Sequence, residues 1–173
     1  MQTRSILRFL AGGVLALTMA AAPGALRAQQ HFFVLGPAAM QKLMPATVFY
    51  RGQVATSQLR NSGGVKFSDG YYVLAALVDT SGYSGGIASK YQAYFVTEVP
   101  IQVGGRELGA GVYGIGFVAG NKFLVTDVGG HDVLTVESAT DSAMKRPMPL
   151  QVLAEPGGRF RLYCGRKYVV MSR

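Results

Sequence analysis

The chain is poor in the residue types that carry most catalytic and metal chemistry. Among its 173 residues are one cysteine, two histidines and 9 acidic residues against 17 basic ones. A single cysteine, Cys164, excludes an internal disulfide, so a small fold stapled by disulfide bonds is excluded. Neither His31 nor His131 lies near Cys164 in the sequence, so no adjacent base for a nucleophilic thiol is evident. No cofactor is expected from these residues.

The first 28 residues have the layout of a secretory signal peptide. Arg4 and Arg8 precede the apolar stretch FLAGGVLALTMAAA, and small residues allow cleavage after Ala28. The apolar core is shorter than the roughly 20 residues of a membrane-spanning helix. We therefore expect a periplasmic or secreted protein whose mature chain begins at or near Gln29, with a retained membrane anchor as the alternative.

Cleavage would leave one β-rich domain, residues 29–173, which is long enough to bury a core without disulfides. It removes Arg4, Arg8 and Arg27 and no acid, so the net charge falls from +8 to +5. This moderate positive charge favours an anionic surface, such as lipopolysaccharide or anionic lipid, or an acidic partner. Nucleic acid is not expected as a partner of an exported protein.

Short apolar segments between turn residues predict an all-β fold, either an antiparallel β-sandwich or a small barrel. One short helix is expected first, over 37–44, between Pro37 and Pro45. The expected strands share a richness in Val, Phe, Tyr and Leu and cover 46–54, 64–67, 71–78, 91–99, 111–118, 122–128, 132–138, 150–155 and 159–164.

Turn residues predict how some of these strands connect. Gly120-Asn121 and Gly129-Gly130 lie between apolar strands, so residues 112–138 are expected to form a three-stranded meander. Residues 137–149 are the longest stretch without strand character. A connection of that length often crosses from one sheet to another.

The segment GAGVYG, residues 109–114, has the Gly-x-Gly-x-x-Gly spacing of dinucleotide-binding loops. Such a loop needs a helix directly after it, because the phosphates rest on the helix amino terminus. Here the chain continues as Ile-Gly-Phe-Val, which alternates like a strand and runs into a turn. A dinucleotide is therefore excluded as a ligand.

The same segment presents a strand face without side chains. Gly114 and Gly116 share one face of the expected strand, while Tyr113 lies on the other. Glycines in a strand mark a place where a neighbour approaches closely. That neighbour is either a covering aromatic ring or a bound ligand, so Gly114, Gly116 and Tyr113 are the candidate ligand-binding residues.

Cys164 is the candidate for covalent chemistry. In RFRLYC the thiol alternates onto the apolar face with Phe160 and Leu162, which predicts a packed core cysteine. The nearby cationic residues Arg161, Arg166 and Lys167 would lower the thiol pKa and support a second interpretation, a reactive nucleophile or redox sensor. An intermolecular disulfide is a third, because the cysteine has no partner within the chain.

Asp127, His131 and Asp132 form the candidate metal cluster, in the turn TDVGGHDV. The three side chains are suitable ligands for a divalent cation, but no further nitrogen or sulfur ligand accompanies them. Asp and His beside Gly-Gly are also ordinary turn residues. No metal site is assigned on this pattern.

The segment RELGAGVYGIGF, residues 106–117, resembles small exported bacterial domains of unknown function in which a Leu-x-Ala-Gly-x-Tyr segment starts a strand. The resemblance implies a β-sandwich and no activity. We expect a binding or envelope accessory protein for an apolar ligand or a protein partner. The alternatives are a small exported enzyme that uses Cys164 and an eight-stranded outer-membrane barrel.

Overall fold

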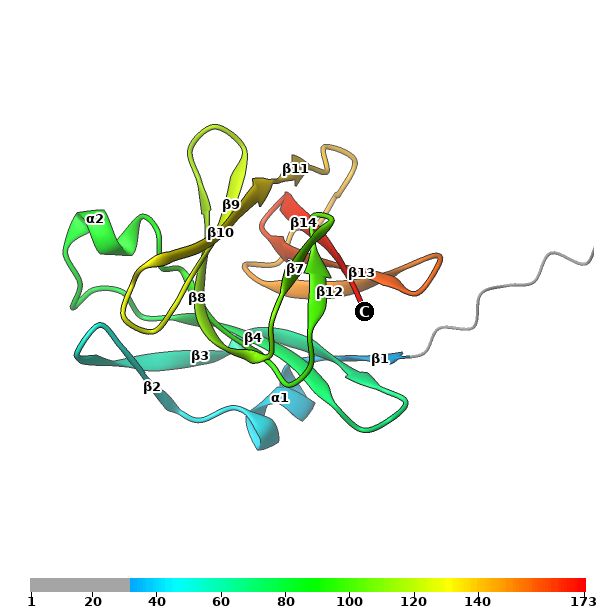
Figure 1. Ribbon diagram of the computed structural model, residues 1–173, viewed down its shortest axis with the longest axis horizontal. Helices are drawn as coiled ribbons and strands as arrows, with labels where there is room; N and C mark the ends of the chain where they lie inside the picture. Colours follow the sequence, from blue (N-terminus) through cyan, green and yellow to red (C-terminus); the bar gives the residue numbers. More distant parts are fainter. Residues whose placement is uncertain (1–31) are drawn as a thin grey trace, which may run out of the picture.

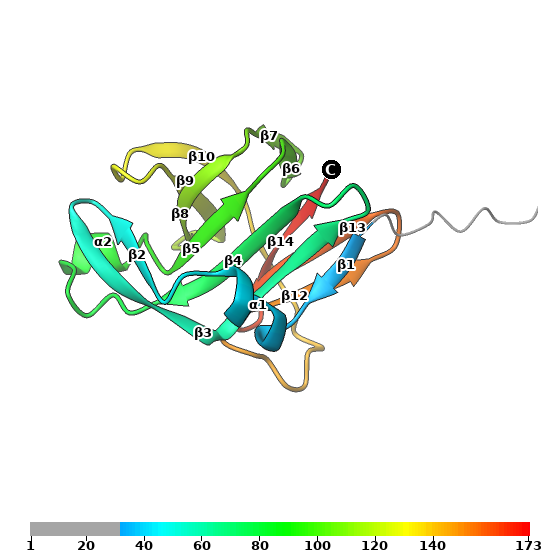
Figure 2. The same ribbon diagram turned by 90° about the horizontal axis from the view of Figure 1, so that it is seen from below.

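A computed structural model of the chain describes residues 32–173 as two antiparallel β-sheets packed face to face (Figures 1 and 2). The expected signal peptide, residues 1–28, and the expected mature amino terminus, Gln29, lie outside the described residues. Among the residues that are described, neither helix has the length and apolar character needed to cross a membrane.

The first sheet has eight strands. In spatial order they are β1 (Phe32–Leu35), β3 (Gln53–Phe67), β4 (Tyr72–Val78), β5 (Ala93–Thr97), β8 (Gly111–Val118), β9 (Lys122–Thr126) and β10 (Asp132–Glu137), with β2 (Thr47–Tyr50) paired to β3. The pairing of β8 with β9 and of β9 with β10 confirms the expected meander. Both Gly120 and Asn121 have positive φ, as a tight mirror-image turn requires.

The second sheet has six strands. Its order is β12 (Gln151–Glu155), β13 (Arg159–Cys164), β14 (Lys167–Ser172), β6 (Ile101–Val103) and β7 (Arg106–Leu108), with β11 (Ala139–Thr140) paired to β14. The chain enters this sheet twice, first through the β6–β7 hairpin and later after β10. The chain crosses between the sheets at residue 138, between β10 and β11, inside the expected crossing segment 137–149. The rest of that segment does not cross, because β11 and β12 both belong to the second sheet, and residues 139–140 form a strand that the sequence did not predict.

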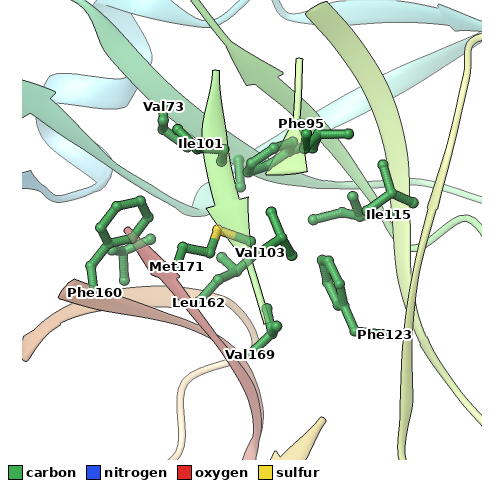
Figure 3. Close-up of a cluster of buried hydrophobic side chains, with 14 of the residues drawn as sticks. Val73, Phe95, Ile101, Val103, Ile115, Phe123, Phe160, Leu162, Val169 and Met171 are labelled. Carbon is green, nitrogen blue, oxygen red and sulfur yellow. The ribbon is translucent and has the colours of Figure 1, made fainter. Parts of the chain in front are cut away.

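The main core fills the space between the two sheets (Figure 3). Phe95 and Ile115 come from the first sheet, and Phe160, Leu162 and Met171 come from the second; each is at most 2% exposed. Apolar area removed from water contributes about 25 cal/mol per Å², so this interface holds the two sheets together.

The outer face of the first sheet is also covered. Helix α1 (Pro37–Leu43) packs Met40 against Leu74 and Ala76 of β4, whose Val73 and Ala75 point into the main core. Covering both faces explains why β4 is apolar at successive positions rather than at alternate ones.

Two sequence predictions are corrected by this arrangement. The sandwich is confirmed, but the small barrel is wrong, because the described strands form two open sheets rather than one closed cylinder. The expected strand over 46–54 is also wrong, since it is the β2–β3 hairpin. Arg51 and Gly52 both have positive φ, and this turn reverses the chain in the middle of the segment.

Candidate functional site

Three tyrosines form a second apolar cluster at one end of the first sheet. The rings of Tyr50 and Tyr91 stack with centroids 3.7 Å apart, and Tyr83 meets both rings edge-on, with centroids 6.1 and 5.6 Å away. Tyr50 comes from β2, and the other two flank the short helix α2 (Gly85–Ala88). This tyrosine cluster fixes α2 and the β2–β3 hairpin to each other.

The tyrosine cluster packs directly against Gly114 of β8. A Cβ atom at this position would lie 2.6 Å from Tyr50 Cε2 and 2.8 Å from Tyr91 Cδ2, closer than real Cβ atoms approach. The Tyr50 hydroxyl lies 2.8 Å from Thr126 Oγ1, which donates a hydrogen bond to the Gly114 carbonyl oxygen at 3.2 Å. The bare strand face expected from the sequence is thus occupied by aromatic rings at Gly114.

Gly116 has a different neighbour. A Cβ atom there would overlap the carbonyl oxygen of Lys90, so the chain that leaves α2 passes directly over this glycine. Gln92 then anchors that chain to β8, because its side-chain amide accepts from Phe117 N at 3.0 Å and donates to Phe117 O at 3.1 Å. Gly116 therefore positions the backbone of Lys90.

Tyr91 carries a buried hydroxyl without a hydrogen-bond partner among the described residues. Its side chain is fully buried, and burial together with Tyr83 and Tyr50 raises its pKa above the ordinary tyrosine value. Leaving a buried donor unsatisfied costs about 1–3 kcal/mol.

Tyr91→Phe should therefore stabilise the fold by about 1 kcal/mol, because it removes the unsatisfied hydroxyl and keeps the stacked ring. Urea unfolding measures the change. Tyr50→Phe is the matched variant and should lose about 1 kcal/mol, since the Tyr50 hydroxyl bonds Thr126. A loss of stability in Tyr91→Phe as large as in Tyr50→Phe would contradict the assignment.

A surface pocket opens beside the tyrosine cluster. Its volume is about 350 Å³. Its lining residues come from the hairpin turn, α2 and the β9–β10 loop, which lie together at the end of the molecule that carries α2 (Figures 1 and 2). They are Tyr50, Arg51, Ser84, Gly86, Ile87, Lys90 and Gly130, and we call this site the tyrosine pocket.

The hairpin turn at the pocket is held by hydrogen bonds on both sides. The Tyr83 hydroxyl donates to the carbonyl oxygens of Tyr50 at 3.1 Å and Gln53 at 3.4 Å. Arg51 N donates to the carbonyl oxygen of Val128 at 2.9 Å, which ties the turn to the β9–β10 loop. The hairpin turn that lines the tyrosine pocket is therefore held by hydrogen bonds to its backbone.

Two of the candidate metal residues, Asp127 and His131, lie on the β9–β10 loop, and the third, Asp132, begins β10. His131 Nδ1 lies 2.9 Å from Asp127 Oδ2, and His131 N donates to Asp127 Oδ1 at 2.9 Å. Asp132 instead faces Lys90, with Nζ 3.5 Å from Oδ1. The structure brings Asp127 and His131 together as a turn-closing pair, and no set of three such ligands gathers in the described part of the chain.

Tyr113 and Cys164 lie away from the tyrosine pocket. Tyr113 packs against the main core and its hydroxyl donates to Gly109 O at 3.0 Å. Cys164 packs against the same core beside an apolar cavity of about 10 Å³, which is too small for an organic ligand. Burial raises the pKa of the Cys164 thiol, and nearby Lys167 offsets this only in part, so the thiol is protonated at neutral pH.

Sequence reasoning missed the three residues that shape the tyrosine pocket most directly, Tyr50, Arg51 and Lys90. The absence of a side chain at Gly114 could have predicted a large neighbour such as Tyr50, because a strand glycine leaves room for one. Arg-Gly at 51–52 resembled the middle of a strand. No protein-family model matches the chain, and neither a curated protein nor a solved structure matches it.

Proposed function

We propose that the protein is an exported binding protein that holds a small ligand in the tyrosine pocket. The observation that carries the proposal is the pocket itself. Its volume is about 350 Å³, and the hairpin turn on one side of it is held by hydrogen bonds to the backbone. Small-molecule sites usually measure about 300–1,000 Å³ and are largely formed before the ligand binds. The signal-peptide layout of residues 1–28 supports export.

A binding role fits the chemistry near the tyrosine pocket better than catalysis does. The pocket is lined by tyrosine, isoleucine, glycine, serine and two cationic side chains. The candidate nucleophile Cys164 lies between the sheets instead, with a pKa raised by burial. A raised pKa lowers the thiolate fraction, and the thiolate is the form that reacts.

The test is native mass spectrometry of the full chain purified from its own cell envelope. We expect a retained ligand as an added mass on the wild-type protein. Gly86→Phe should abolish the added mass, because Gly86 lines the tyrosine pocket and has open space around its Cβ position.

Gly85→Phe is the matched control for this test. Gly85 lies in the same short helix and has equally open space, but it does not line the tyrosine pocket. Gly85→Phe should therefore keep the ligand, and both variants should melt at similar temperatures. Equal retention by Gly86→Phe and wild-type protein, or no added mass on the wild-type protein, would refute the proposal.

A further inference from the structure

We propose that the tyrosine pocket recognises an anionic group, a carboxylate or a phosphate, through Arg51 and Lys90. This inference rests on the proposed function, since it names the chemistry of the ligand in the same pocket. Both side chains line the pocket, Arg51 from the hairpin turn and Lys90 from the chain after α2. A planar guanidinium matches carboxylate and phosphate oxygens in two parallel hydrogen bonds.

Arg51 has no acidic partner of its own. It makes no ion pair within residues 32–173, whereas Lys122 on the same sheet pairs with Glu137. The carboxylate on the adjoining β9–β10 loop, Asp127, is already bonded to both the backbone N–H and the ring of His131. The guanidinium charge of Arg51 is therefore left for a ligand to neutralise.

The position of Arg51 is also unusual for its residue type. Arg51 has φ +49°, a left-handed conformation in which glycine or asparagine is the ordinary residue. Its side chain lies against Gly130, where a Cβ atom would overlap Arg51 Cδ. Gly130 thus leaves the space that brings the arginine side chain across the loop to the pocket.

Lys90 supplies the second positive charge, and one acid faces it. Its Nζ lies 3.5 Å from Asp132 Oδ1, longer than a normal charge-assisted hydrogen bond, and half of the Lys90 side chain is exposed. Donors of the ammonium group therefore stay free for a second acceptor. The apolar part of the ligand would contact Ile87, which also lines the pocket.

The test compares three probes of similar shape on the full chain: benzoate, phenyl phosphate and neutral benzamide, titrated calorimetrically at low ionic strength. We expect one or both anions to bind at least about tenfold tighter than benzamide, since hydrogen bonds to charged groups are the stronger ones. The preferred anion distinguishes a carboxylate ligand from a phosphate ligand. Equal affinity for benzamide and the anions, or no binding by any probe, would overturn the proposal.

Arg51→Asn tests the residue itself, because asparagine tolerates the positive φ and removes the guanidinium together with the outer methylene that lies against Gly130. It should weaken anion binding about tenfold and leave the melting temperature unchanged or higher. Lys90→Gln should also weaken binding of the anionic probes. The control Lys122→Gln also breaks a lysine–acid pair of the first sheet, outside the tyrosine pocket, and should bind as wild type does.

Wild-type affinity in Arg51→Asn would refute the role of the guanidinium. The probe titrations do not decide the proposed function, because that proposal is tested by the ligand mass retained in the native mass spectra. An added mass that Gly86→Phe removes, together with equal probe affinities, would leave a binding protein with a neutral ligand. Anion binding that Gly86→Phe leaves intact would place the anion outside the tyrosine pocket.

Discussion

Gly116→Val should lower the free energy of unfolding by about 3 kcal/mol, the upper end of the usual range for overpacking. The added side chain would overlap the carbonyl oxygen of Lys90, and a backbone atom moves less readily than the end of a flexible side chain. Gln92 holds the same chain to Phe117 by two hydrogen bonds, so the backbone has little freedom to relax. Urea unfolding measures the loss as a lower midpoint at constant slope.

Gly85→Val is the control for this substitution. Gly85 is exposed, has no positive φ, and no atom lies within 4 Å of its Cβ position, so the change in stability should stay within about 0.5 kcal/mol. Unaltered stability in Gly116→Val, with loss of a retained ligand, would mean that a ligand and not the backbone of Lys90 occupies the bare strand face.

Phe160→Ala should cost about 3–5 kcal/mol, the usual loss for a buried phenylalanine. Phe160 is 1% exposed on β13 and meets two rings across the sandwich, Phe32 at 5.4 Å and Phe67 at 6.4 Å between centroids. These rings come from the opposite sheet, so truncation leaves a cavity where the two sheets meet (Figure 3). Thermal and urea unfolding both report the loss.

Leu153→Ala is the matched control, because Leu153 is 41% exposed on the neighbouring strand β12. Its loss should be about 0.5 kcal/mol, as for most surface substitutions. Equal losses for the two variants would show that Phe160 does not lie between the sheets.

The fold class could be predicted because local sequence patterns indicated most of the strands and turns. The segments 111–118 and 159–164 form strands at those bounds, because both are short, rich in strand-forming residues and flanked by turn residues. The middle of β3, residues 55–63, was missed for the opposite reason. Its sequence ATSQLRNSG is mostly polar, and it forms a strand through pairing with β2 and β4 that no local pattern records.

The candidate site could be predicted only in part. Gly114 and Gly116 mark the two places where neighbours come close, and their spacing in a strand was visible in the sequence. The neighbours Tyr50 and Lys90 come from segments far away in the chain, so their position beside the glycines depends on strand order. Strand order is set by long-range pairing and by the burial of both sheet faces, which single segments do not encode.

The register shift in β3 between Gln58 and Ser62 divides that strand into two mechanical parts. Beyond the shift the strand belongs to the main core, while the part before it carries the hairpin that has its own small tyrosine cluster. Local opening of such a hairpin costs less free energy than global unfolding. If the pocket binds a ligand as proposed, its apparent affinity would equal the intrinsic affinity multiplied by the fraction of molecules whose hairpin is closed. Sequence changes at the register shift would then alter binding without contacting the ligand.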